Sequence, residues 1–274
     1  MRIHPFTYYI MMFCLFVACD EVDKNERLIY VAPASVERAV LIEDFTGQRC
    51  VNCPTATTVI QQLQELYGED NVIAVGIHSG PYAHRSTMTS PLLSLGTTIG
   101  DEYYNYFKVT AQPALMVNRH TSLIYNVNLL GEEVHNALSE QSPLQLTLEA
   151  TRETQGQQVE VSISAMSNED FTDAKVQVWV VEDSIVDAQY MPDGTINRTY
   201  IHNHVLRASV TQQTLGDDFP VDKENTTYCT YSFPIDAAWN PAHLSIVAFV
   251  YTERQGVIQV RKTPIMESSP QKKD

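Results

Sequence analysis

The sequence predicts an α/β domain followed by an all-β sandwich, with a short secretory segment in front of them. Two patterns predict this order: strand and helix signals alternate between residues 37 and 142, and a hydrophobic period of two runs through residues 143–265. A chain of 274 residues has room for two domains of ordinary size. Its 33 acidic residues against 18 basic ones give a net charge of −15, which disfavours binding to nucleic acid.

Residues 1–18 have the pattern of a signal peptide. Arg2 precedes an apolar run that ends at Ala18 and is too short for a secure transmembrane helix. Phe16-Val17-Ala18-Cys19 then resembles the bacterial lipobox, which implies a lipid anchor on Cys19 and attachment to a membrane. An ordinary secretory signal cleaved nearby is the alternative. Residues 19–36 are charged and aperiodic, which is typical of a solvated tether.

The first strand and helix of the α/β region meet at a C-x-x-C motif. Residues 39–42 form an apolar run that predicts a buried strand, and apolar side chains recur at helical spacing over 59–67, after Pro54. Cys50 and Cys53 therefore lie at a strand-to-helix junction. The partial positive charge of a helix N-terminus favours the Cys50 thiolate, which is the form that takes part in disulfide exchange.

This segment resembles the thioredoxin superfamily. Asp44-Phe45 precedes Cys50 at the spacing of thioredoxin's buried Asp-Phe pair, a second strand is predicted at 72–77, and Pro113 precedes a further strand as the superfamily's cis-proline does. The resemblance implies a redox-active Cys50–Cys53 disulfide in which Cys50 attacks and Cys53 resolves. It also implies that Asp44 relays the proton of Cys53, and that Pro113 faces Cys50 and helps to hold substrate backbone.

The motif departs from thioredoxin in ways that leave its redox direction open. Val51-Asn52 separates the two cysteines, and the 60 residues from Cys53 to Pro113 predict an insertion around 79–98. An inert structural disulfide is one alternative, and a metal site is another. Three histidines, His78, His84 and His120, are scattered without ligand spacing, so we predict no metal and no other cofactor.

From residue 143 onward the hydrophobic period changes to two. Apolar and polar side chains alternate over 144–148, 159–163, 176–180 and 246–250, and turn-forming residues separate these runs. The pattern predicts an antiparallel immunoglobulin-like sandwich over 143–265, followed by a polar tail at 266–274.

Three features of the second half attract separate interpretations. The segment 197–219 is long enough to predict a binding loop. Cys229 shares strand parity with Tyr231, which predicts a buried free thiol on an apolar face. His202 and His204 are expected on one strand face as a surface pair, since no third metal ligand accompanies them.

The order of these segments resembles one group of proteins, the twenty-eight-kilodalton outer-membrane-protein-related lipoproteins of Bacteroidetes. The motifs that carry the resemblance are Phe45-Thr46-Gly47, Cys50-Val51-Asn52-Cys53-Pro54 and His202-Asn203-His204-Val205-Leu206-Arg207. It implies an outer membrane lipoprotein, either periplasmic or surface-exposed. Two functions stay open: thiol–disulfide exchange with extracytoplasmic protein thiols or disulfides, and non-enzymatic surface binding or adhesion with a structural C-x-x-C.

Overall fold

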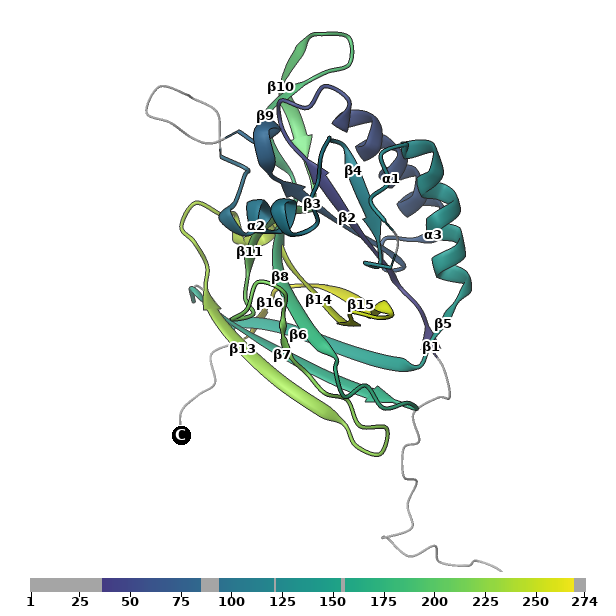
Figure 1. The fold of residues 1–274 in the computed structure, drawn as a ribbon. Coiled ribbons are helices and arrows are strands. Elements are labelled where there is room, and N and C mark those ends of the chain that lie inside the picture. The colour runs from purple at the N-terminus through teal and green to yellow at the C-terminus, as the bar shows by residue number, and fades with distance from the viewer. Residues whose placement is uncertain (1–35, 85–93, 121, 154–155, 269–274) are drawn as a thin grey trace, which may run out of the picture. The chain divides into compact units, whose positions relative to one another are not determined.

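One mixed β-sheet, built by both halves of the sequence, organises the fold (Figure 1). The computed structural model describes residues 36–84, 94–120, 122–153 and 156–268. In chain order the elements are β1 (Val36–Glu37), β2 (Val40–Thr46), α1 (Cys53–Tyr67), β3 (Val72–His78), η1 (Gly80–Tyr82), α2 (Thr98–Tyr106), β4 (Ala114–Val117), η2 (Val127–Leu129), α3 (Leu130–Ser139), β5 (Gln141–Ser142), β6 (Leu144–Glu153), β7 (Gln158–Ser167), β8 (Lys175–Glu182), β9 (Ile185–Tyr190), β10 (Ile196–His202), β11 (Val205–Ser209), β12 (Asp217–Asp218), β13 (Thr227–Pro234), η3 (Pro241–His243), β14 (Leu244–Thr252), β15 (Gly256–Pro264) and β16 (Met266–Ser268).

The central sheet has the strand order β15-β14-β8-β11-β3-β2-β4, and β12 pairs with β8. β2 and β3 are parallel, and β4 is antiparallel to β2. β11 joins the two halves, because it pairs in parallel with β3 at Val205 and Gly76 and antiparallel with β8. The predicted α/β and all-β regions therefore share one hydrogen-bonded sheet.

β2 and β3 are buried along their whole length, as their apolar sequences predict. On one face Ile42 and Leu115 pack with residues of α1 and α3, including Ile60 and Val134. On the other face Phe45 and its neighbours pack with α2. This arrangement confirms the predicted α/β region around the C-x-x-C motif.

A second sheet, in the order β13-β7-β6-β16, packs against the C-terminal part of the central sheet. Their shared core combines Val161 and Ile163 of β7 with Val178 of β8 and Ile246 of β14. Two packed sheets are thus present, but one of them continues into the α/β region. The immunoglobulin-like topology and the domain boundary at 142–143 stay predictions, and the described residues belong to one compact unit.

The structure corrects two expectations at the level of elements. The segment 197–219 is not one loop, because β10, β11 and β12 lie within it. Strand structure also extends into the predicted polar tail, since β16 pairs in parallel with β6. The predicted signal peptide, Cys19 and nearly all of the tether lie outside the described residues. Within the described ranges, no helix has both the length and the hydrophobicity needed to cross a membrane.

Candidate functional site

Cys50 and Cys53 form a disulfide where β2 leads into α1, with their Cα atoms 5.4 Å apart. α1 begins at Cys53, so the first cysteine lies in the turn before the helix and the second in its first turn. The turn is closed by the Cys50 amide, which donates to the Gly47 carbonyl over 3.0 Å. Both cysteines are buried, with 3 % of Cys50 and 1 % of Cys53 exposed. A partner thiolate therefore has little access to either sulfur.

Gly47 is required in this turn by the close approach of another backbone segment. A Cβ atom at position 47 would lie 2.4 Å from the carbonyl carbon of Tyr82. The two segments are also bonded, because the Arg49 amide donates to the Tyr82 carbonyl over 3.0 Å. The glycine of the Phe45-Thr46-Gly47 motif thus allows the C-x-x-C turn to pack against η1.

Asp44 lies on the face of β2 that packs against α1, the helix that begins at Cys53. Side chains alternate along a strand, so Asp44 shares its face with Val40 and Ile42, which pack in the core beneath α1. Only 5 % of Asp44 is exposed, and its Oδ1 atom has no hydrogen-bond partner. Burial raises the pKa of this carboxyl to about 7. Asp44 can therefore take up or release a proton near neutral pH.

Pro113 lies at the same end of the sheet as Cys50. The Gln112–Pro113 peptide bond is cis and directly precedes β4, whose first residue pairs with Phe45. Gln112 Nε2 donates to the carbonyls of Thr46, over 2.8 Å, and Ser79, over 3.1 Å. The loop before β4 is thereby fixed at the carboxyl ends of β2 and β3. The fold thus brings all four predicted site residues to one end of the sheet.

The β9–β10 hairpin also belongs to this end of the molecule, and sequence reasoning missed it. The two strands form a separate antiparallel sheet next to the C-x-x-C turn (Figure 1). Gln189 Nε2 donates to the Cys50 carbonyl over 3.0 Å, and the Tyr190 amide donates to the Gln48 carbonyl over 2.8 Å. The turn signal Met191-Pro192-Asp193-Gly194 lies at the hairpin tip and could have located it.

His202 is not part of an exposed histidine pair. It is 5 % exposed, and its ring packs edge-on against that of His78 with centroids 5.3 Å apart. His204 lies outside the strands with a φ of 57° and pairs through Nδ1 with Asp183 Oδ1 over 2.9 Å. Burial lowers the pKa of His202 to about 4, against the opposing effect of Asp187, so its ring is neutral at pH 7.

The His202–Arg207 motif anchors the base of the hairpin and the start of β11. Asn203 Oδ1 accepts a hydrogen bond from the Ser184 amide over 2.8 Å. The His204 amide donates to Asp183 Oδ1 over 2.6 Å, and Arg207 pairs with Glu182 over 3.3 Å. The side chains of Asn203, His204 and Arg207 therefore each have a polar partner at the crossing between the hairpin and the central sheet.

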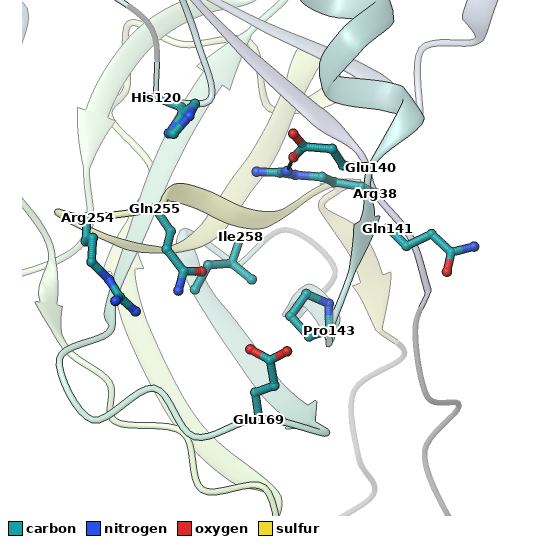
Figure 2. Close-up of a pocket in the computed structure, with 9 residues that line it drawn as sticks. All are labelled: Arg38, His120, Glu140, Gln141, Pro143, Glu169, Arg254, Gln255 and Ile258. Carbon is teal, nitrogen blue, oxygen red and sulfur yellow. Dashed lines mark hydrogen bonds and ion pairs between the residues drawn. The ribbon is translucent and has the colours of Figure 1, made fainter.

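Two other features lie apart from the disulfide. Cys229 of β13 is a free thiol that packs against the apolar core, as its strand parity predicts, but it is half-buried rather than buried, and this burial raises its pKa to about 11. A cavity of about 360 Å³ is lined by Arg38 and Glu140 from the α/β region and by Pro143 and Gln255 from the second half (Figure 2). None of the predicted site residues lines it.

Among the described residues, no three His, Cys, Asp or Glu side chains gather closely enough to hold a metal ion.

Comparisons with known proteins indicate a family and a fold. The family model described as outer membrane protein Omp28 matches residues 100–269. This range includes Pro113 and the His202–Arg207 motif, but it begins after Cys50 and Cys53. No curated protein matches the sequence.

Two solved structures come from Porphyromonas gingivalis. HBP35 is 14 % identical, with a TM-score of 0.69 over 88 % of this chain and 80 % of its own. A domain of the outer membrane lipoprotein Omp28 is 20 % identical over 46 % of this chain and 92 % of its own, with a TM-score of 0.34. At these identities HBP35 shows a shared fold alone, and the second likeness is too slight to carry an argument.

Proposed function

The chain belongs to the Omp28 family of outer membrane proteins, and from this premise we propose that it exchanges thiols and disulfides with extracytoplasmic proteins. The observation that carries the proposal is Asp44. A buried carboxyl without a partner on Oδ1 is costly to a fold, and here it lies on the face of β2 that packs against α1, the helix that begins at Cys53. Its pKa of about 7 is suited to moving a thiol proton at neutral pH.

The proposed reaction uses the reduced protein as follows. The Cys50 thiolate attacks one sulfur of a substrate disulfide, which forms a mixed disulfide and releases one substrate thiolate. Asp44 accepts the proton of Cys53, and the resulting Cys53 thiolate attacks the Cys50 sulfur. The Cys50–Cys53 bond forms and the second substrate thiolate leaves, so the substrate is reduced by two electrons and the protein is oxidised. The same steps in reverse oxidise a substrate dithiol.

Pro113 supports the proposal by its position. It precedes β4 at the end of the sheet where the Cys50 turn begins. A substrate segment that reaches Cys50 has the loop before β4 beside it. We therefore assign Pro113 to holding the substrate backbone next to the attacking sulfur.

One observation favours a second function, surface binding or adhesion with a structural disulfide. Both cysteines are almost fully buried in the oxidised protein. A disulfide that never exchanges can be buried in this way. The large second half of the chain, which a dedicated redox enzyme does not need, then provides the binding surface.

A Cys53→Ser variant distinguishes these two functions. Without its resolving thiol, the variant is expected to accumulate mixed disulfides through Cys50 with envelope proteins, visible on non-reducing gels and reversed by reductant. The Cys50→Ser variant is the matched control and is expected to trap none. If Cys53→Ser traps nothing, and the purified protein neither reduces nor oxidises a test disulfide, the exchange function is wrong.

We also propose that the protein is held at the membrane through lipid on Cys19. Metabolic labelling with palmitate is expected to mark the wild-type chain and not Cys19→Ala. Labelling that survives this substitution contradicts the lipid anchor. The face of the membrane on which the protein lies, periplasmic or external, follows from protease digestion of intact cells.

A further inference from the structure

The β9–β10 hairpin has two chemically different faces. Its register pairs Tyr200 with Asp187 and His202 with Ile185, so alternate residues of both strands share a face. The inner face comprises Ile185, Asp187, Gln189, Tyr200 and His202, of which all except the half-buried Tyr200 are 8 % exposed or less. The outer face carries Val186 and Ile201, which are cross-strand partners and each 55 % exposed.

The inner face is bonded to the turn that contains Cys50. Gln189 Nε2 donates to the Cys50 carbonyl over 3.0 Å and to the Gly47 carbonyl over 3.4 Å. Asp187 Oδ2 accepts a hydrogen bond from Gln48 Nε2 over 2.6 Å. The amide of Tyr190 donates to the Gln48 carbonyl over 2.8 Å. Hydrogen bonds to residues 47, 48 and 50 thus hold the hairpin against the turn.

The hairpin also reaches the helix that carries Cys53. Burial raises the pKa of the Tyr200 hydroxyl, a hydrogen bond with Thr57 opposes this shift, and the carboxyl of Asp44 adds to it. Thr57 Oγ1 in turn donates to the Cys53 carbonyl over 3.3 Å. Residues of the hairpin therefore flank the disulfide from the side of the turn and from the side of the helix.

Outside these contacts, the hairpin is fixed at its base. It belongs to neither of the two larger sheets. At its base Asp183 pairs with His204 over 2.9 Å and with Lys262 over 3.1 Å. The base is therefore anchored by the Asp183–Lys262 ion pair and the Asp183–His204 contact, whereas the middle is held by hydrogen bonds to the C-x-x-C turn and by the packing of buried inner-face side chains such as His202 on His78.

We propose that the β9–β10 hairpin is a cover that determines which partners reach the disulfide, and that Gln189 and Asp187 hold it closed. This inference rests on the proposed exchange function and names its substrate class, a polypeptide that displaces the hairpin. Small thiols in the envelope are excluded because they cannot supply the contacts that replace those of the cover.

The reactivity of the disulfide toward dithiothreitol in the full chain tests this proposal. One thiolate of the reagent attacks Cys50 and breaks the Cys50–Cys53 bond, and its second thiolate then displaces Cys50. The reagent is oxidised to its cyclic disulfide, and the protein gains two thiols that maleimide labelling counts. The Asp187→Ala/Gln189→Ala variant is expected to be reduced roughly ten- to a hundredfold faster than wild type, because the three side-chain hydrogen bonds that join the cover to residues 47, 48 and 50 are lost.

Two further variants test whether faster reduction comes from the lost hydrogen bonds rather than from poor folding. Gln189→Leu keeps the size of the side chain without its donors and is expected to react about tenfold faster, even if the double variant folds poorly. Val186→Ala/Ile201→Ala alters only the outer face and is the matched control, expected within about twofold of wild type by the same reasoning. Wild-type reduction rates in both Gln189 variants overturn the proposal.

The dependence of the rate on urea separates opening of the cover from unfolding of the whole chain. Opening of one hairpin exposes little surface, so low urea is expected to change the rate only slightly. A steep dependence, equal to that of global unfolding, contradicts a local cover. The dithiothreitol rate is measured without a protein substrate. Unchanged rates in the Gln189 variants therefore reject the proposed cover, but they do not decide the exchange function, which the Cys53→Ser variant tests separately.

Discussion

Glu43 and Asp44 are consecutive buried carboxylates on β2, and their surroundings on opposite faces of the sheet differ completely. Glu43 is fully buried and is bonded to Arg119, whose Nη2 donates to Oε1 over 2.9 Å and whose Nε lies 3.1 Å from Oε2. Asp44, one residue later, has an oxygen without a partner. The same strand therefore carries one carboxylate that the fold satisfies and one that it leaves free to titrate.

Arg119, the partner of Glu43, is itself enclosed by aromatic side chains. Five aromatic rings surround its guanidinium, with centroids 4.8 to 5.7 Å from Cζ: Tyr103, Phe107, Trp179, Phe249 and Tyr251. Burial lowers the pKa of Arg119, but the charge and hydrogen bonds of Glu43, together with Tyr103 and Tyr251, outweigh this effect and the net shift is upward. The comparison indicates that Glu43 stabilises the fold, whereas Asp44, with an unpartnered Oδ1 atom, fits the proton-transfer role proposed for it.

Removing the partner of Glu43 is expected to have the largest effect. Arg119→Met keeps an unbranched apolar side chain among the rings but leaves a buried carboxylate unpaired. The variant is expected to lose about 3–5 kcal/mol of unfolding free energy, measured by urea denaturation at pH 7. A loss below about 1 kcal/mol contradicts a structural role for the pair.

Asp44→Asn, unlike Arg119→Met, is expected to raise the free energy of unfolding above neutral pH. The pKa of Asp44 is raised from 3.8 to about 7 in the folded protein, so the unfolded chain releases this proton first as pH rises. The wild type therefore loses stability between pH 4 and pH 7. Because the asparagine does not titrate, the variant is expected to be more stable than wild type by about 2–4 kcal/mol at pH 8 and similar to it below pH 4.

Urea denaturation of both proteins at pH 3.5 and pH 8 checks this sign. Asp44→Asn gaining nothing at pH 8 contradicts the raised pKa. Glu43→Gln is the matched control, since it changes the neighbouring carboxylate. It leaves Arg119 without its anionic partner and is expected to destabilise the protein at pH 8.

Replacing both members of the satisfied pair sharpens the comparison further. Glu43→Gln/Arg119→Met removes both buried charges and is expected to recover most of the loss of the Arg119→Met variant, ending within about 2 kcal/mol of wild type. Urea denaturation of all three variants completes a double-mutant cycle. Additive losses contradict direct coupling between the two side chains.

The smallest effect is expected at Cys229, a half-buried thiol away from both carboxyl groups. Burial raises the pKa of this thiol to about 11, so it stays protonated at pH 7. Iodoacetamide is expected to modify Cys229 at least about tenfold more slowly in the folded protein than in the urea-unfolded chain, as peptide mass spectrometry can show. Cys229→Ser is expected to leave exchange unchanged, and faster labelling of Cys229 contradicts its assignment as an inert thiol.

The sequence predicts the local chemistry of the site better than its surroundings. The apolar run before the C-x-x-C motif, the helical spacing after it and the proline before β4 each depend on neighbouring residues, and together they place the four predicted site residues. The shared sheet could not be predicted, because β11 pairs with β3 across more than a hundred residues. The alternation that indicates β8 and β14 is the same whichever sheet those strands join.

The β9–β10 hairpin could not be predicted from the sequence for a different reason. β9 has buried polar residues on its inner face, Asp187 and Gln189, where a hydrophobic pattern expects apolar ones. β10 is mostly exposed and has no apolar face of its own. The polar inner face of β9 is stabilised by its hydrogen bonds to the C-x-x-C turn. The local sequence does not reveal this neighbour.

The pH dependence of exchange tests the central claim most directly. The measurement is the rate at which the reduced full chain reduces a disulfide-bonded test protein between pH 5 and pH 9, for wild type and Asp44→Asn. The account predicts that the wild-type rate rises through a step near pH 7, as Asp44 ionises and can accept the proton of Cys53, and that the variant lacks this step. An absence of exchange, or the same profile for both proteins, contradicts the account.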